Sequence, residues 1–493
     1  MTPWSTASSA SSLTTASPWP IWLPILVIGA AVIGLLSSLI LSKSHSCRGG
    51  GIPTSVAAIR GVFNFKWISG IILLPISALL TFLAGLPLGT EGPCVQMGTA
   101  VGDGVIKCLG REKHKGWRRY IMTGGAAAGF SIATSSPISA IIFSMEEIHK
   151  HYSPMLLSAV SVSVLVAQLT SRLLAAIGIG DIHFFHMPNI ESMPLSAFFV
   201  PLIIGIVCGL CSVIYTRFYL TINRIIRRIL EKLSVKIVLP ILFALIAIVG
   251  FFLADALGTG HSIIESLFTP GYIWYMLILL LLIRAIGTIV CNVSGATGGV
   301  FLPNLAFGAI VGALCADGMI SLGWIGSEHY VIIVVLGITS FLGATSRIPL
   351  TACVFAVEAL NGINNIIPIV IATTISLVIV EAFGIEDLTD TIIEAQQHKI
   401  TDGKKSFDIE APLVVKKNSF VVGKHLSDIL WPNSCVVVAF NSQDRSKNHG
   451  LISDGDIITV HYTTYDPNST ANELCNLVGE QSEDLMQILS SYD

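Results

Sequence analysis

The chain has 493 residues, of which 53% are hydrophobic and only 12% are charged, and its formal net charge is −3. Its mean hydropathy is +0.76. Soluble globular proteins carry about 25% charged residues, so the composition excludes an ordinary soluble protein and indicates a helical protein that crosses a bilayer several times. Because the chain has no net positive charge and no basic stripe with interleaved aromatic residues, nucleic acid is not an expected partner.

The charges divide the chain into parts, because 25 of the 59 charged residues lie in residues 386–493. We predict a polar N-terminal segment (1–20), a transmembrane domain (21–400), a small soluble domain (405–478) and a C-terminal tail (479–493). Several apolar runs in the second part reach or approach the roughly 18 residues that a membrane span needs. These runs are residues 21–41, 71–88, 155–166, 201–215, 237–257 and 272–290.

Lys and Arg gather in three short segments that give the chain an orientation. They follow the first apolar run, at Lys43 and Arg48, and recur in residues 111–119 and 224–236. Because cytoplasmic loops carry an excess of Lys and Arg, all three segments are expected in the cytoplasm and the N-terminus outside. We therefore predict a multi-pass protein of the plasma membrane, of the bacterial inner-membrane type, with its C-terminal domain in the cytoplasm. The N-terminal flanks do not fit a secretory signal.

One sequence unit occurs twice. Pro137–Glu146 and Pro349–Glu358 share proline, a hydroxyl residue, alanine, phenylalanine and glutamate at the same offsets, and the glycine- and proline-containing stretches 91–102 and 301–312 match upstream of them. The two copies lie about 210 residues apart. Repeats of this kind in membrane transporters usually place the substrate site at their interface.

Three glycine-rich segments, 49–53, 89–93 and 298–303, each end in a proline. Helices broken at membrane depth are tolerated where the backbone lines a cavity. The N-terminus of such a helix offers unpaired N–H groups and the positive end of the helix dipole to an anion. Glycine permits a close approach of the backbone, and proline suits the first turn. The alternative is that the helices are broken only to allow close packing. This explanation could account for a single segment of this kind, but it accounts less well for three.

Two carboxylates stand out. Glu91 begins an otherwise apolar intramembrane helix, where a charge is costly and usually functional. When ionised, the Glu91 carboxylate competes with an anion for the N–H donors of the helix start, and when protonated it leaves these donors. It can therefore act as both gate and proton carrier. The alternative is that Glu91 only caps the helix. Glu146 has a repeat counterpart in Glu358, so we interpret these two as structural and Glu147 as the unpaired, functional acid.

Other polar residues receive structural interpretations. Arg284 and Arg347 are intramembrane cations that we expect to pair with carboxylates or cap helix C-termini rather than attract anions. The cysteine pair Cys208 and Cys211 lacks a second pair for zinc, and the histidine pairs lack carboxylate and cysteine partners. These histidine pairs are His149 with His151 and His183 with His186. We therefore expect no metal and no cofactor.

An enzyme is not expected, because neither an HExxH nor a GxSxG motif is present. A sensor or receptor could use residues 405–478, but this function would leave the three anion-type helix ends unexplained.

The order and spacing of these motifs resemble the CLC family of chloride channels and proton-coupled chloride antiporters over residues 21–400. The resemblance implies an all-α, inverted-repeat CLC-type fold with broken helices, and a homodimer in the lipid bilayer with one pore in each subunit. It implies that Glu91 is the external gating and proton glutamate and that Glu147 is the internal proton glutamate. The anion-binding residues it implies are Gly50, Gly51, Val300, Phe301 and Thr389. The family also has a helix before residue 21, so the N-terminus is expected to be truncated or to start late.

The chain departs from the family at three positions. The usual serine of the first loop is Gly50, the arginine before the gating glutamate is Thr90, and the pore tyrosine aligns with Thr389. Two side-chain hydroxyls that face the central anion are thus absent or shortened, so chloride is expected to depend on backbone N–H groups and to bind weakly. We predict chloride/proton antiport; the alternatives are fluoride/proton antiport within the same family and a passive chloride channel of the voltage-gated type.

Residues 405–478 have the pattern of a small β-rich, α+β domain. Apolar runs at 413–415, 435–440 and 457–462 alternate with Gly, Asn and Asp, as strands and turns do. Asp454-Gly455-Asp456 predicts a turn or hairpin before the last strand. This part resembles the TrkA-C (RCK C-terminal) regulatory domain of potassium-transport subunits, which implies dimerisation or a small ligand, although the sequence assigns no residue to ligand binding.

Overall fold

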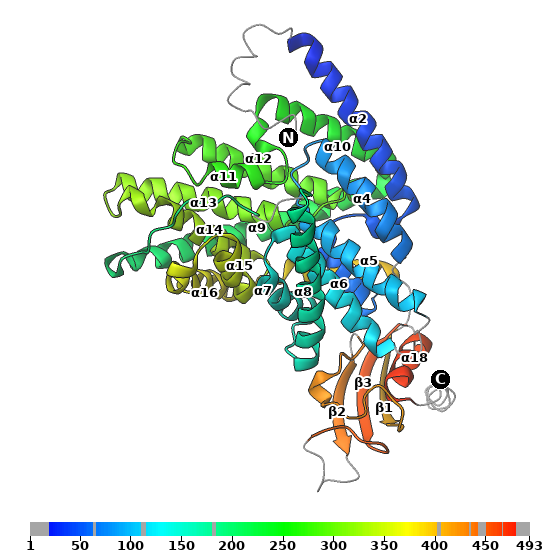
Figure 1. Cartoon of the computed structure of the whole chain (residues 1–493). Coiled ribbons are helices and arrows are strands. Elements are labelled where there is room, and N and C mark those ends of the chain that lie inside the picture. The colour runs from blue at the N-terminus through cyan, green and yellow to red at the C-terminus, as the bar shows by residue number, and fades with distance from the viewer. Residues whose placement is uncertain are drawn as a thin grey trace.

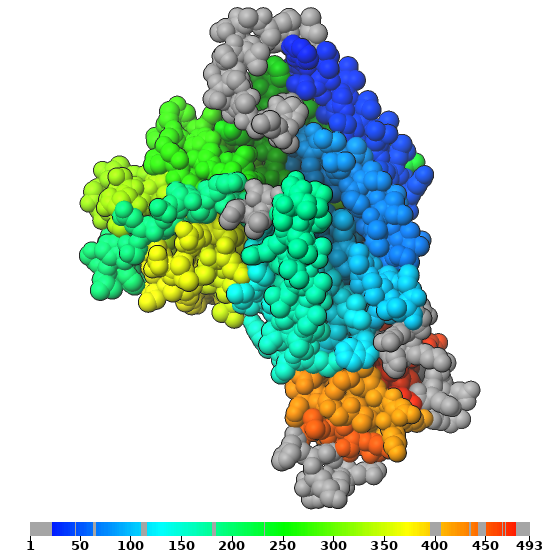
Figure 2. Space-filling view, viewed as in Figure 1, coloured from blue at the N-terminus to red at the C-terminus, as the bar shows by residue number. Residues whose placement is uncertain are grey.

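A computed structural model describes residues 19–62, 66–109, 115–179, 184–401, 406–432, 435–441, 450–465 and 467–479. Most of the N-terminal segment, the tail from residue 480, residues 111–114 of one basic segment, and His183 lie outside the described residues. The chain forms a large helical part and a small domain with a sheet (Figure 1). The small domain, orange to red, projects from one end of the helical part (Figure 2).

The first half of the helical part runs from α2 to α8. Its elements are α2 (Trp19–Lys43), η1 (His45–Cys47), α3 (Ile52–Arg60), α4 (Trp67–Leu83), α5 (Glu91–Cys108), α6 (Lys115–Thr134), α7 (Pro137–Phe143), the π-helical turn η3 (Ser144–His149) and α8 (Pro154–Ala176). The predicted run 71–88 ends as helix at Leu83, because Gly85 has a φ of 71° and Pro87 follows it.

The second half runs from α9 to α17. Its α-helices are α9 (Phe199–Lys232), α10 (Val235–Phe252), α11 (His261–Ser266), α12 (Trp274–Val293), α13 (Phe301–Ser321), α14 (Tyr330–Thr345), α15 (Pro349–Ala359), α16 (Ile366–Ala382) and α17 (Leu388–Thr401). Short 3-10 turns connect them: η4 (Leu195–Ala197), η5 (Ala254–Ala256), η6 (Ser327–His329) and η7 (Ile363–Asn365).

Eight helices in the described part of the chain are long and apolar enough to cross a membrane. The chain is therefore a multi-pass membrane protein, as the composition predicts. One predicted loop differs: most of the basic segment 224–236 is helical, because α9 continues for 34 residues as far as Lys232. Lys and Arg favour helices, and the stretch contains no glycine or proline to end one.

The repeat is inverted at its centre. Gly89 and Gly299, which occupy equivalent positions in the two copies, form an antiparallel bridge. The N–H group of each donates to the carbonyl of the other, at 2.7 and 2.8 Å. A residue can pair reciprocally with its own counterpart only if the two copies are related locally by a two-fold axis. The predicted inverted-repeat fold is therefore confirmed, together with the small mixed domain.

The two repeat copies also cap each other's helices. The carboxylate of Glu358 accepts two N–H groups in the first turn of α7, at 2.9 and 2.8 Å. The carboxylate of Glu146 accepts two N–H groups in the first turn of α15, at 3.0 and 2.8 Å, and the Thr351 hydroxyl at 2.7 Å. First-turn N–H groups have no partner within their own helix, so both glutamates supply missing acceptors. This arrangement supports their interpretation as structural.

The two intramembrane arginines cap backbone carbonyls. Arg284 is fully buried and donates to three carbonyls of residues 255–258, at 2.9 to 3.1 Å. Arg347 donates to the carbonyl of Ile385. Both contacts agree with the capping expected from the sequence.

The small domain is a three-stranded antiparallel sheet with one packed helix. Its elements are β1 (Phe407–Val414), η8 (Leu426–Asp428), β2 (Cys435–Asn441), β3 (Ile457–Thr464) and α18 (Pro467–Val478), in the strand order β1-β3-β2. Phe407 pairs with Thr464, and Cys435 with Tyr462. Three strands are present as predicted, although β1 lies mostly before the predicted run 413–415 and ends at Val414. A turn precedes β3 at Gly455, whose φ is 82°.

Candidate anion-binding site

The three glycine-rich loops meet through their backbones. The N–H group of Gly49 donates to the carbonyl of Gly295, and the Gly49 carbonyl accepts from Gly298, both at 3.4 Å. The third loop is bonded in turn to the second through the Gly89–Gly299 bridge. The helices that follow the loops, α3, α5 and α13, therefore begin at one shared network of hydrogen bonds.

Glycine is required sterically where the loops touch. A Cβ atom on Gly92 would overlap the carbonyl oxygen of Gly50 and lie 2.9 Å from the Cα of Gly299. Gly51 has a φ of +72°, and a Cβ there would overlap the carbonyl of Gly92. These contacts are between backbone atoms, so side-chain rearrangement cannot relieve them. The close approach of all three helix starts thus depends on the missing side chains.

We expect Gly92→Ala to separate the loops and abolish transport. The added methyl group must displace backbone on two sides, and overpacking a buried position costs about 1–3 kcal/mol, occasionally more. Gly318→Ala is the matched control, because Gly318 lies in α13 and no atom beyond its neighbouring helix backbone is within 4 Å of its Cβ position. Flux in liposomes and the melting temperature measure both effects. Normal transport by Gly92→Ala would show that the close packing of the loops is dispensable.

The loops leave a set of backbone donors free. The N–H groups of Gly50, Gly51, Val300 and Phe301 have no hydrogen-bond acceptor in the described part of the chain. Val300 and Phe301 stand at the start of α13, where the positive end of the helix dipole adds to the donors. Such unpaired N–H groups at a helix start can hold an anion.

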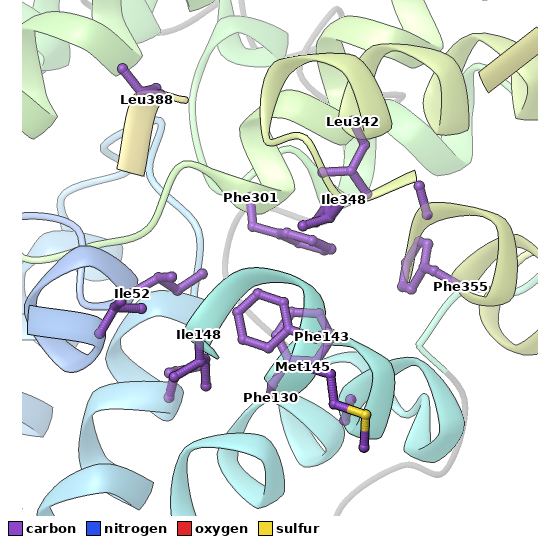
Figure 3. Packing of buried hydrophobic residues seen from close by; sticks show 14 of the residues in the cluster. Ile52, Phe130, Phe143, Met145, Ile148, Phe301, Leu342, Ile348, Phe355 and Leu388 are labelled. Atoms are coloured by element: carbon purple, nitrogen blue, oxygen red, sulfur yellow. The ribbon is translucent and has the colours of Figure 1, made fainter. Parts of the chain in front are cut away.

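The side chain of Phe301 anchors this helix start. Its ring packs edge-on against Phe130 at 5.1 Å and Phe355 at 5.9 Å between ring centroids. Figure 3 shows the Phe301 ring near Phe143 and Ile348, with Ile52 and Leu388, the first residues of α3 and α17, on the other side. The ring therefore belongs to the core, which leaves the backbone of Phe301 for an anion.

Glu91 lies at the first turn of two helices. Its side chain is fully buried, and a Cβ atom on Gly89 would overlap its Oε2 and lie 3.2 Å from Leu302 and Pro303. The backbone amides of Glu91 and Leu302 face the carboxylate, but neither oxygen has a well-aligned hydrogen bond from a described residue. The carboxylate thus occupies the space between the starts of α5 and α13, where an anion would meet the same donors.

Glu147 lies in a second, charged setting. Its side chain is only 3% exposed, and its Oε2 has no hydrogen-bond partner among the described residues. The Thr389 side chain lies beside the carboxyl group, and Asp387 and Lys150 act on it electrostatically. Lys150 forms an ion pair with Asp387 at 2.7 Å, and Asp387 caps α17 by accepting the N–H group of Thr389 at 3.0 Å.

Sequence reasoning did not identify the Lys150–Asp387 pair beside Glu147. An aspartate directly before a helix is a capping signal and could have identified Asp387. Thr389, predicted to bind the anion, has its side chain beside Glu147, so that role stays a prediction.

The inverted repeat, the broken helices and the buried glutamates define a membrane transport protein. The chain belongs to the voltage gated chloride channel family, or CLC family, whose family model matches residues 33–381. It is 25% identical over 418 residues to the H(+)/Cl(-) exchange transporter ClcA of Cronobacter sakazakii (strain ATCC BAA-894). The alignment covers 82% of this chain and 88% of the relative.

Solved structures share the fold. A slow cyanobacterial Cl-/H+ antiporter matches with a TM-score of 0.71 and 21% identity, over 80% of this chain and 91% of that chain. A CLC-type fluoride/proton antiporter matches with a TM-score of 0.54 and 20% identity, over 75% and 98% of the two chains.

Proposed function

We propose that the protein exchanges chloride for protons across a membrane, with Glu91 as gate and external proton carrier. The observation that carries this proposal is the position of the Glu91 carboxylate between the starts of α5 and α13. An ionised carboxylate there excludes an anion from the donors, and protonation removes the charge that holds it at two positive helix ends. Anion entry and proton uptake are then linked at one group. The similarity to an exchange transporter supports the same function.

Glu147 is the proposed inner proton carrier. A buried carboxyl group with a free oxygen, next to an ion-paired network, can take up a proton where a bare buried charge would be costly. The anion between the two glutamates contacts the N–H groups of Gly50, Gly51, Val300 and Phe301, and Thr389 contributes from α17.

Fluoride is the second candidate substrate. The glycine at position 50 removes a hydroxyl donor from the site, and the fold is also similar to that of a fluoride/proton antiporter. Chloride stays first, because the curated relative that is 25% identical over 418 residues is an H(+)/Cl(-) exchange transporter. A passive chloride channel is the third candidate.

Flux measurements in liposomes test the proposal. We expect an outward chloride gradient to drive proton uptake by liposomes that contain the purified protein, and protein-free liposomes to show none. Chloride flux without proton movement would indicate the channel. Proton movement driven by fluoride but not by chloride would transfer the assignment to fluoride.

We further propose a homodimer in the plasma membrane, with residues 405–478 as a TrkA-C-like regulatory domain in the cytoplasm. Arg119 at the start of α6 forms an ion pair with Glu473 of α18 at 2.8 Å and donates to the carbonyl of Leu430 at 2.8 Å. Arg119 belongs to a basic segment that the positive-inside rule assigns to the cytoplasm. The contact therefore supports a cytoplasmic position for the domain.

A cavity of about 450 Å³ between this domain and the transport part supports a small ligand there. Arg60, Lys150 and Trp431 are among the residues that line it. Nearby, Lys424 lies 3.1 Å from the centre of the Phe420 ring, and burial lowers the pKa of Lys424 to about 8. The charge of Lys424 is therefore expected to change in mildly alkaline solution.

A further inference from the structure

The space beside Gly50 is taken by a side chain from another helix. A Cβ atom on Gly50 would lie 3.1 Å from Nδ2 of Asn292, which is tighter than an ordinary contact. Asn292 belongs to α12, just before the third loop, and is 8% exposed. The amide of Asn292 is thus in tight contact with the position where the Cβ atom of the family's first-loop serine would lie.

Neighbouring groups fix which end of the amide faces Gly50. The hydroxyl of Tyr219, a residue of α9 that is 2% exposed, donates to Oδ1 of Asn292 at 2.6 Å. Nδ2 donates to the carbonyl of Gly298 at 3.3 Å. The Gly298 carbonyl can only accept a hydrogen bond, so it must face Nδ2 of Asn292. The Tyr219 hydroxyl can donate to Oδ1, so the amide has a single favourable orientation.

One donor of this amide remains available. An asparagine amide has two N–H bonds, and Gly298 takes one of them. The described part of the chain provides no acceptor for the second. Its nitrogen lies between the first loop, at Gly50, and the third loop, at Gly298, which carry the four free backbone donors described above.

We propose that Asn292 binds the transported anion through Nδ2 and replaces the hydroxyl that Gly50 cannot supply. The ligand is a small halide held between the first and third loops, so this inference rests on the proposed function and adds a residue to its substrate site. Tyr219 is a positioning residue: it holds the amide oxygen, which would repel an anion, away from the site.

The proposal makes positions 50 and 292 dependent on each other. A serine at position 50 would place its Cβ against the Asn292 amide, so Gly50→Ser alone adds a hydroxyl but disturbs the donor already present. Asn292→Ala vacates the space, and a serine at position 50 then fits. The serine hydroxyl at position 50 and the Asn292 amide are therefore alternative donors. Gly50→Ser combined with Asn292→Ala should restore the chloride binding that is lost when Asn292 alone is replaced.

Chloride titration calorimetry on the purified full-length protein tests this relation. We expect Asn292→Leu, which keeps the side-chain volume, to weaken chloride binding about ten- to a hundred-fold, the range for one hydrogen bond to a charged group. Asn292→Asp, which keeps the shape and the Tyr219 contact, should weaken it as well. Gly50→Ser alone should not strengthen binding. Asn292→Ala combined with Gly50→Ser should bind chloride about as tightly as the wild type.

Each result has a distinct consequence. If Asn292 were purely structural, its substitution would lower the melting temperature, and adding Gly50→Ser would not restore chloride binding. That result would overturn the proposal. Unchanged chloride affinity in folded Asn292→Leu or Asn292→Asp would also overturn it and leave chloride/proton exchange intact. If the wild type itself bound no chloride, the proposed function would fail and this inference with it. If Asn292→Leu did not fold, the aspartate variant and the double variant would decide.

Discussion

Replacing Glu91 by glutamine should abolish proton movement driven by a chloride gradient while chloride flux continues. Glutamine has the shape of a protonated glutamate but cannot exchange a proton. Because it carries no charge, it is not held at the two positive helix ends and leaves their donors to the anion. Paired chloride and pH electrodes on the same liposome suspension measure both fluxes.

The same substitution should remove the pH dependence of transport. In the wild type, a fall in pH protonates Glu91 and frees the anion site, so chloride flux should rise as pH falls. In Glu91→Gln this response should be flat. Glu328→Gln is the control, because Glu328 is half-exposed in η6 and outside the site. Proton pumping that survives in Glu91→Gln would refute the assignment of Glu91 as proton carrier.

The helix starts could be predicted because their signals are local. Glycine before a helix and proline within its first turn are read directly along 49–53, 89–93 and 298–303. The repeat predicted that the second and third segments are equivalent, and the antiparallel bridge between Gly89 and Gly299 is the structural form of that equivalence. Local signals and one long-range symmetry were thus sufficient to predict the helix starts around which the candidate site is built.

The helix caps that the two repeat copies exchange could not be predicted from the repeat. The sequence identifies Glu146 and Glu358 as counterparts, which favours a structural role for both. It does not predict that each carboxylate serves the other copy's helix. That contact depends on the two-fold relation between the copies, which is a tertiary property.

Asn292 shows the same limit more strongly. A polar residue in the apolar helix 274–293 is a signal of function or of a buried hydrogen bond, yet nothing along the chain connects it with Gly50 or with Tyr219. These residues come from three separate helical regions, and their contact depends on how α9, α12 and the first loop pack. From the sequence, the glycine at position 50 predicts that the anion site lacks a hydroxyl donor. In the proposed site, the Asn292 amide, which lies next to Gly50 in space, supplies a donor instead.

Glu147→Gln should uncouple proton movement from chloride flux without loss of stability. The Glu147 carboxylate has a free oxygen and makes no helix cap, so the amide fits in its place. The substitution removes the inner proton carrier but leaves Glu91 and the backbone donors in position. Chloride flux should therefore persist while chloride-driven proton movement falls to the level of protein-free liposomes.

The adjacent Glu146→Gln should behave in the opposite way. Glu146 accepts three hydrogen bonds at the start of α15, at 3.0, 2.8 and 2.7 Å. Hydrogen bonds to a charged group contribute about 1.5–3 kcal/mol each, and an amide removes the charge and one of the two accepting oxygens. The melting temperature should fall clearly, while the protein that remains folded exchanges chloride for protons at the normal ratio. Uncoupled transport in Glu146→Gln, together with coupled transport in Glu147→Gln, would reverse the two assignments, because the capped carboxylate would then carry the proton.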